Sequence, residues 1–331
     1  MQKVYIGVDI SKKTLDLAMT RDGETIDGIL HTTNSEEGFK KIKSWISINS
    51  PGHQVHVCME ATGKYGERVE EFFHKMESCS VSVCNPFRIS SFARSQLSRT
   101  KTDKSDAKLI ACYLVRMKPA VTRPVSEIVK KIKEKRRFML SLKQEIVQEK
   151  GRLDHYSDST VCAMIHETIK QLGIQVQKLS KEILDLKDAD EEFRKNYTLL
   201  ISIPAISSQT ALTLLTEMIP QSPGVISRKV QTAHAGLAPS IKQSGTSVFS
   251  CKLTPYASHH LKNALYFPTL SAIRYNPMIA AFYLKLIQSG KPKMVAVVAC
   301  MRKLLHIAIG ILNNQVPFDP SFRSAYSLVL K

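Results

Sequence analysis

The first third of the chain alternates short apolar segments with amphipathic ones. The segments VYIGVDI, TLDLAMT, HQVHVCME and CSVSVC are short, apolar and rich in β-branched residues, which predicts strands. The segments SEEGFKKIKSWI, GERVEEFFHKM and KSDAKLIACYLV space their apolar residues by three and four, which predicts helices, the first with Ser35 as its N-cap. Because strands alternate with helices, we expect an α/β domain in residues 1–122.

From about residue 125 the apolar period changes to spacings of three, four and seven. This period predicts two long helices that form a coiled-coil hairpin or seam, and we assign residues 123–196 to it. The same spacing fits packing within one chain and packing between two chains. The apolar positions are Ile128, Ile132, Met139, Leu142, Ile146 and Leu153, followed by Leu172, Val176, Leu179, Ile183, Leu186 and Phe193.

Residues 197–331 predict a third, mostly helical region. Glycine and proline residues in AHAGLAPSIKQSGTS and the following segment predict a loop at about 235–258 between helices. The most apolar stretch, MVAVVACMRKLLHIAIGIL, is interrupted by Arg302, Lys303 and His306, so we expect no membrane span. The N-terminus reads as a strand rather than a signal peptide, and the seven cysteines show no C-x-x-C spacing. We therefore expect a cytoplasmic protein with reduced thiols.

The net charge of the chain indicates the kind of partner that it binds. The 331 residues carry a formal net charge of +18 and a pI near 9.6, which favours a polyanion such as nucleic acid as the partner. The run KKIKEKRR at residues 130–137 fits a solvated helix face and a phosphate-binding face equally well. The candidate nucleic-acid contacts are Arg99, Lys101, Lys104, Lys130, Lys131, Arg136, Arg137 and Lys242.

Four carboxylates stand at positions that favour a metal site. Asp9 and Glu60 each end an apolar strand segment, and sites in α/β sheets form at the carboxyl ends of strands. Asp103 and Asp106 are three residues apart, so they share one helix face. Hard oxygen ligands favour Mg²⁺ or Mn²⁺. Taken alone, the second pair fits a helix N-cap and a first-turn acid better, and Glu60 also fits an ion pair with Lys64.

Several blocks of the sequence resemble the DEDD-type transposases of insertion sequences, the IS110 family that includes the Piv invertase. They are GVDISKKTLDLA, MEATGKYGERVEEFF, VCNPFRISSFARSQLSRTKTDKSDAKLIACYL and HAGLAPSIKQSGTS, in this order, and the resemblance continues through GKPKMVAVVACMRKLLHIAIGIL and VPFDP. It implies a RuvC-like domain of the ribonuclease H fold in residues 1–122, with Asp9, Glu60, Asp103 and Asp106 as ligands of Mg²⁺ or Mn²⁺. It implies a helical linker and a transposase domain in residues 197–331, in which Ser244 is the nucleophile.

The resemblance also implies a 5′-phosphoserine link to donor and target DNA and a non-coding guide RNA from the element itself. It implies a site shared between subunits, and thus a dimer, with a tetramer at synapsis, acting at the bacterial nucleoid. Sequence choice would then rest on base pairing. One departure concerns Pro204, Ala205, Ile206 and Ser207, where relatives usually read P-G-I-G.

Other functions remain open from the residues alone. A RuvC-like nuclease would cut DNA with water and use the C-terminal half only for binding. Ser240 and Ser247 lie near Ser244, and the sequence does not exclude either of them as the nucleophile. A non-catalytic nucleic-acid-binding protein would carry the same charge. An actin-fold phosphotransferase needs a second glycine-rich phosphate loop, which we do not find in the sequence.

Overall fold

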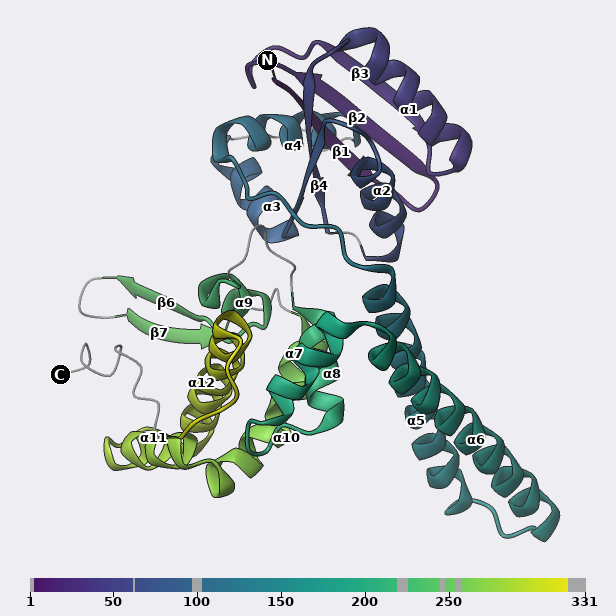
Figure 1. The fold of residues 1–331 in the computed structure, drawn as a ribbon, viewed down its shortest axis with the longest axis vertical. Helices are drawn as coiled ribbons and strands as arrows, with labels where there is room; N and C mark the ends of the chain where they lie inside the picture. The colour runs from purple at the N-terminus through teal and green to yellow at the C-terminus, as the bar shows by residue number, and fades with distance from the viewer. Residues whose placement is uncertain are drawn as a thin grey trace. The chain divides into compact units, whose positions relative to one another are not determined.

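The computed structural model describes residues 3–61, 63–96, 103–218, 226–244, 248–253 and 258–320. The chain divides between Pro124 and Val125 into two compact units, an N-terminal unit and a C-terminal unit. The N-terminal unit is an α/β sheet with helices, and the C-terminal unit is mainly helical (Figure 1).

A five-stranded sheet in the order β3-β2-β1-β4-β5 forms the N-terminal unit. Its strands are β1 (Lys3–Ile10), β2 (Thr14–Thr20), β3 (Gly28–Thr33), β4 (Gln54–Glu60) and β5 (Cys79–Cys84). β1, β2 and β3 pair antiparallel, whereas β4 and β5 join the sheet parallel to β1. The predicted strands are confirmed, and β3 is an additional one.

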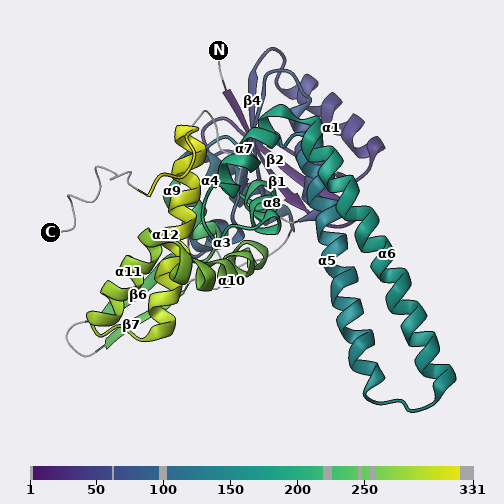
Figure 2. The same cartoon turned by 60° about the horizontal axis from the view of Figure 1, so that its bottom comes forward.

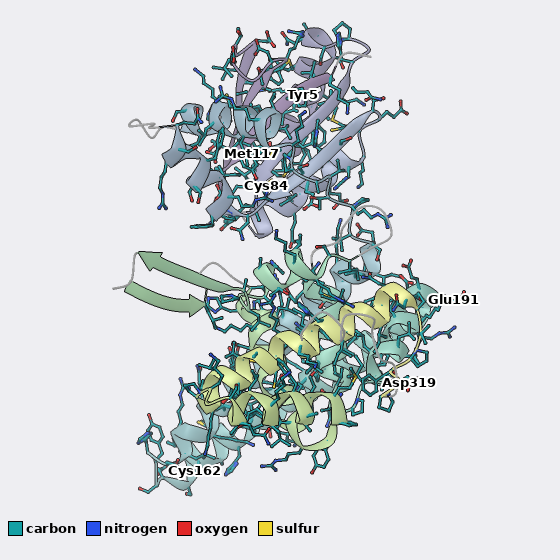
Figure 3. The ribbon with its side chains drawn as sticks, turned by 90° about the vertical axis from the view of Figure 1, so that its left-hand side faces the viewer. Tyr5, Cys84, Met117, Cys162, Glu191 and Asp319 are labelled. Carbon is teal, nitrogen blue, oxygen red and sulfur yellow. The ribbon has the colours of Figure 1, made fainter. Side chains whose placement is uncertain are left out.

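The two faces of this sheet carry different helices. Ile6, Leu17 and Val57 pack on one face with residues of α1 (Glu36–Asn49) and α2 (Lys64–His74). Ser35 caps α1 as expected, because its hydroxyl accepts a hydrogen bond from the amide of Gly38. On the other face, Cys58 packs with residues of α3 (Pro86–Ser95) and α4 (Asp103–Met117). Figure 3 labels Tyr5, Cys84 and Met117 in this unit.

Helix α4 lies in direct contact with the middle of β1. A methyl group on Gly7 would come within 2.2 Å of the carbonyl oxygen of Ala107 and 2.3 Å of the backbone nitrogen of Ala111. Ala18, the cross-strand partner of Gly7 on β2, packs with the same two alanines. Three alanines and one glycine therefore let the helix backbone approach the sheet backbone.

Two long antiparallel helices begin the C-terminal unit, α5 (Glu127–Leu153) and α6 (Ser159–Ala189), and they lie side by side in Figures 1 and 2. Ile132 and Met139 of α5 are buried with Ile183 of α6, with Leu179 and Leu186 packed against them. The predicted pair of helices is confirmed, and this part of the seam packs within one chain.

Among the described residues, the rest of this unit contains the helices α7 (Glu191–Ile201), α8 (Ser208–Glu217), α9 (Arg228–His234), α10 (His259–Tyr275), α11 (Pro277–Gln288) and α12 (Lys293–Asn314). Residues of α7, α8, α10, α11 and α12 pack together in one core. By length and composition alone α12 would be long enough to cross a membrane. Its Leu304, Leu305 and Ile309 are fully buried in this core, which is typical of the central helix of a helical domain.

One expectation for local structure was wrong. The predicted loop at 235–258 contains an antiparallel hairpin of β6 (Pro239–Ser244) and β7 (Val248–Leu253). A proline at the first position of a strand is tolerated, so Pro239 did not exclude a strand there. After the end of β5, Pro86 begins α3 at its first position, where its missing N–H costs nothing and Asn85 serves as the cap.

Candidate functional site

Asp9 and Glu60 end two neighbouring parallel strands. The last paired residues of β1 and β4 are Val8 and Met59, and each acid is the next residue on its strand. Side chains alternate along a strand, so Asp9 shares the sheet face of Gly7, and Glu60 shares the face of Cys58. Gly7 and Cys58 both lie on the face of the sheet that α4 covers, so Asp9 and Glu60 share that face. The structure therefore brings Asp9 and Glu60 side by side at the carboxyl edge of the sheet.

The direction of α4 places Asp106 toward the same edge. Ala107 touches Gly7 in the middle of β1, whereas Val115 lies against Gly23, which follows β2 at the opposite end of the sheet. The helix therefore runs from the carboxyl end of β1 toward its amino end. Asp106 precedes Ala107, and Asp103 is the first residue of the helix, with its side chain outside the described residues.

The donor chemistry of this edge fits a hard divalent cation. Its carboxylates supply oxygen ligands, which Mg²⁺ and Mn²⁺ prefer. Over the ranges that the structure describes, no three His, Cys, Asp or Glu side chains stand close enough together to hold a metal ion. The side chain of Asp103, the fourth acid of the predicted set, lies outside the described residues.

Sequence reasoning overlooked a further acid at this edge. Asp16 on β2 is the cross-strand partner of Asp9 and is 4% exposed. Nδ1 of His31 on β3 lies 2.9 Å from Oδ1 of Asp16 and donates a hydrogen bond to it, since an ionised carboxylate only accepts. The segment TLDLAMT carries one acid within a predicted strand, a signal that could have identified Asp16.

Ser244 is the last residue of β6 and pairs with Val248 across the hairpin. The side chains of Ser244 and Lys242 are outside the described residues, as is that of Lys104. Arg99 and Lys101 also lie outside them. Their predicted roles therefore stay predictions.

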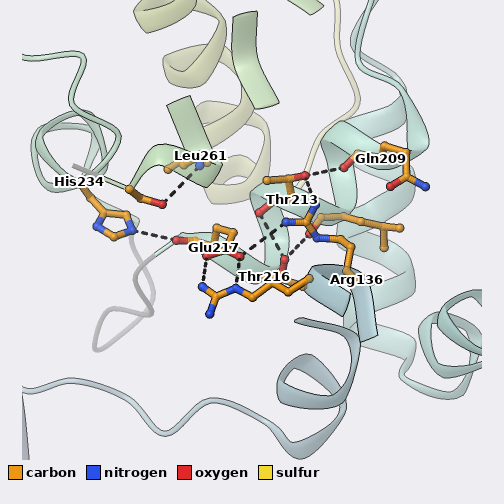
Figure 4. A network of polar contacts seen from close by, with 10 residues as sticks. Arg136, Gln209, Thr213, Thr216, Glu217, His234 and Leu261 are labelled. Atoms are coloured by element: carbon orange, nitrogen blue, oxygen red, sulfur yellow. Dashed lines mark hydrogen bonds and ion pairs between the residues drawn. The ribbon is translucent and has the colours of Figure 1, made fainter. Parts of the chain in front are cut away.

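The basic run at 130–137 contains a buried polar network rather than a uniform exposed face (Figure 4). Arg136 is 3% exposed, and its Nη1 donates to Oγ1 of Thr213 at 2.7 Å. Arg137 donates through Nε at 3.1 Å and Nη2 at 2.9 Å to the two carboxylate oxygens of Glu217. Glu217 also lies 3.6 Å from Nη2 of Arg136. These contacts attach α5 to the end of α8.

Burial and neighbouring charges shift the pKa values of the groups in this network. Burial opposes ionisation of Glu217, but the hydrogen bond and charge of Arg137, with nearby Lys133 and Arg136, lower its pKa overall. Burial lowers the pKa of Arg136. Nε2 of His234 on α9 donates to the backbone carbonyl of Glu217 at 3.0 Å, and burial lowers the pKa of this histidine too. The network thus links three helices.

Lys130 and Lys131 differ from the two arginines. Lys130 forms an ion pair of 2.9 Å with Glu127, which is largely exposed, and Lys131 is itself exposed. Contact with nucleic acid stays a prediction for the two lysines and the two arginines. Arg136 and Arg137 have a structural role that the charge pattern did not reveal, because a charge run shows no difference between buried and exposed positions.

Comparisons with known proteins agree along almost the whole chain. Residues 6–162 match the transposase family of the DEDD IS110 type, and residues 197–284 match the transposase family IS116/IS110/IS902. The pilin gene-inverting protein of Moraxella bovis is 31% identical over 327 residues, which cover 96% of this chain and 98% of that protein. The pilin gene-inverting protein of Moraxella lacunata is equally similar, with the same identity and coverage. The chain therefore belongs to the IS110 family of transposases, DNA-recombining enzymes to which the pilin gene-inverting proteins are related.

Proposed function

We propose that this transposase cuts and rejoins DNA with a metal site in its N-terminal unit and a serine nucleophile in its C-terminal unit. In this proposal the N-terminal unit has a RuvC-like ribonuclease H fold. Three antiparallel strands continued by two parallel ones, with acids at the carboxyl edge, support that assignment. The observation that carries the proposal is the pair of neighbouring strand ends at Asp9 and Glu60, toward which α4 directs Asp106.

Asp9, Glu60, Asp103 and Asp106 would hold Mg²⁺ or Mn²⁺ in this site. The cation supplies stabilisation of the attacking and leaving oxygens of the scissile phosphodiester. The carboxylates would hold and orient the cation. The basic residues Arg99, Lys101 and Lys104, next to the acids in sequence, would bind the DNA backbone.

Ser244 would attack the phosphorus of the scissile bond through its Oγ. The new bond joins Oγ to the 5′ phosphate as Oγ gives up its proton, the bond from phosphorus to the 3′ oxygen breaks, and the 3′ oxygen takes up a proton as a hydroxyl. Rejoining reverses these changes with a different 3′ hydroxyl. The resemblance of HAGLAPSIKQSGTS to the family supports this role, and the backbone of Ser244 ends β6 in the hairpin.

The partners proposed are donor and target DNA, a non-coding guide RNA encoded by the element, and further copies of this chain as a dimer or a tetramer. We propose that the protein acts at the bacterial nucleoid in the cytoplasm. The net charge of +18 supports a polyanionic partner. The name of the Moraxella relatives describes inversion of a pilin gene, a site-specific rearrangement of DNA.

A covalent-trapping assay tests the proposal. The protein would be expressed with its native flanking DNA, denatured in detergent and purified, and attached DNA would be measured. We expect attached DNA for the wild type and for Ser247→Ala, the matched control, and none for Ser244→Ala or Asp9→Asn. Loss in Ser247→Ala alone would move the nucleophile to that residue.

The alternative is a metal-dependent nuclease that uses water. The position of Asp9, Glu60 and Asp106 within one unit favours this alternative, because such a unit needs no serine from the other. Cleaved DNA without any attached protein, in the wild type and in Ser244→Ala alike, would establish it. If neither an adduct nor cleavage is found, with or without the native RNA, DNA binding would be the only remaining function of the three considered.

A further inference from the structure

We propose that a groove between α3 and α4 binds one unpaired base of a single-stranded nucleic acid. The groove has a volume of about 370 Å³, which lies in the range of small-ligand sites. The side chains that line it include Phe87, Arg88, Phe92 and Ser95 of α3 and Tyr113 and Met117 of α4. The inference rests on the proposed partnership with nucleic acid and adds a contact to it.

The groove is distinct from the four predicted metal ligands. Its lining includes none of these acids. Tyr113 and Met117 follow Asp106 on α4 by about two and three helical turns. A ligand in the groove is therefore held by residues that the proposed metal and serine chemistry does not use.

Flat apolar side chains and a guanidinium meet in this groove. Phe87 is 40% exposed and Met117 is 51% exposed. Phe92 packs edge to face against the buried ring of Tyr113, with ring centroids 5.5 Å apart, so its own ring is held in place. Unpaired bases stack on aromatic rings and on the guanidinium planes of arginine. We therefore expect Phe87, Phe92 and Arg88 to contact the faces of the base.

A buried hydroxyl in the lining lacks a hydrogen-bond partner. Tyr113 is 1% exposed, and within the described residues no polar atom forms a hydrogen bond of ordinary geometry with its hydroxyl. Burial, together with the nearby Cys84 thiol, raises the pKa of Tyr113, so the hydroxyl keeps its proton. Buried tyrosine hydroxyls normally find a partner. The edge of a base carries the acceptors that would supply one.

The charge around the groove favours nucleic acid as the occupant. Helix α3 and the part of α4 after Asp106 carry four basic residues and no acidic residue in their sequence. The basic residues are Arg88, Arg94, Lys108 and Arg116. A base in the groove brings its own phosphates, and these side chains complement their charge. A neutral apolar ligand would gain nothing from this charge.

Binding of labelled oligonucleotides to the full chain tests the proposal. Fluorescence anisotropy would measure the affinity for a single-stranded DNA, for the RNA of the same sequence and for the corresponding DNA duplex, at several salt concentrations. We expect Phe87→Ala to weaken single-strand binding about 5-fold or more, because one stacked base is lost. The slope of log affinity against log salt should not change, because no phosphate contact is removed. Duplex binding should stay at the wild-type level, since paired bases are unable to enter the groove.

Phe267→Ala is the matched control, because Phe267 is 73% exposed on α10, in the other unit. It should bind all three oligonucleotides as the wild type does. Weakening of RNA binding alone would support the groove with the guide RNA as the source of the base, and weakening of DNA binding alone would support it with the recombining DNA as the source. Weakening of both would show that either strand can supply the base.

Two results would overturn the inference and leave the partnership with nucleic acid standing. One is wild-type affinity for both single strands in folded Phe87→Ala and Phe92→Ala variants, and Met117→Ala replaces Phe92→Ala if that variant does not fold. The other is equal weakening of single-strand and duplex binding. If the wild type binds none of the three oligonucleotides, the inference and the proposed partnership would both be overturned.

Discussion

Arg137 of α5 donates two hydrogen bonds to the carboxylate of Glu217 at the end of α8, from Nε at 3.1 Å and from Nη2 at 2.9 Å. The preceding residue, Arg136, has a buried guanidinium that lies 3.6 Å from the same carboxylate. One acid therefore balances two cations where the long helical hairpin meets the rest of the C-terminal unit.

Removal of this acid should destabilise the C-terminal unit strongly. Glu217→Ala leaves Arg136 buried without its counter-charge, so we expect the free energy of unfolding to fall by about 3 kcal/mol. Urea denaturation would measure it. Glu182→Gln is the control, because Glu182 pairs with Lys135 at a partly exposed site and should cost less than about 1 kcal/mol. Equal losses in both variants would contradict a structural role for the network.

Replacement of Ala205 by glycine should stabilise the folded protein. Its φ of +78° lies in the left-handed region, where a Cβ atom costs about 1 kcal/mol. We expect Ala205→Gly to raise the melting temperature, and Ala211→Gly, in the buried interior of α8, to lower it. A lower melting temperature for Ala205→Gly would show that the lost methyl contacts outweigh the relieved strain.

Gly7 should tolerate no side chain. A methyl group there would overlap the backbone of Ala107 and Ala111, so Gly7→Ala should cost about 3 kcal/mol or prevent α4 from docking. Circular dichroism during thermal unfolding would detect either result. Gly151→Ala, on α5 with open space around the new methyl group, should stabilise the protein slightly. A near-neutral Gly7→Ala would mean that α4 can move away from β1 easily.

Stability should fall on mild acidification because of His306. Burial, with the nearby charges of Arg302 and Arg228, lowers its pKa from 6.5 to about 4. The folded state thus favours the neutral ring, which is hydrogen-bonded to Thr232 at 2.8 Å, while the unfolded chain binds a proton below about pH 6.5. The contribution is complete above that pH and declines as the pH falls toward 4.

The melting temperature of the His306→Gln variant should therefore fall less between pH 7 and pH 4.5 than that of the wild type. His56, His234 and His260 also have lowered pKa values, so the variant keeps part of the dependence. His166→Gln, at an exposed position on α6, is the control. An unchanged pH profile in His306→Gln would rule out its contribution.

Lys130 and Lys131 provide a test of nucleic-acid binding by α5 that leaves the buried network intact. If both contact phosphates, Lys130→Gln with Lys131→Gln should reduce the slope of log affinity against log salt by about 2. The binding of a duplex at several salt concentrations would measure this slope. A slope equal to that of the wild type would assign these lysines to a solvated helix face.

Sequence patterns predicted most of the N-terminal unit, because apolar alternation and helix caps are local signals. Asp9 and Glu60 could be placed at strand ends in the same way. The missed strand, GILHTT, has only half-buried or exposed apolar residues, so its alternation is weak. It lies at the sheet edge, where β2 alone supplies its partners.

Other features depend on tertiary contacts that no local pattern encodes. The pairing of Asp16 with Asp9 needs the register of β1 and β2, and the burial of Arg136 needs α8, which lies about 75 residues later in the chain. The approach of α4 to Gly7 likewise joins segments far apart in sequence. A glycine within a predicted strand indicates a close backbone approach without naming its partner.

The contact between Gly7 and Ala107 has a consequence for synthesis of the chain on the ribosome. Asp9 and Glu60 emerge early, but Asp106 arrives on a helix that must still seat against the finished strands. A nascent or truncated chain that ends before residue 103 lacks part of the acidic edge. Asp103 and Asp106 are thus the last of the four acids of the proposed cation site to be synthesised.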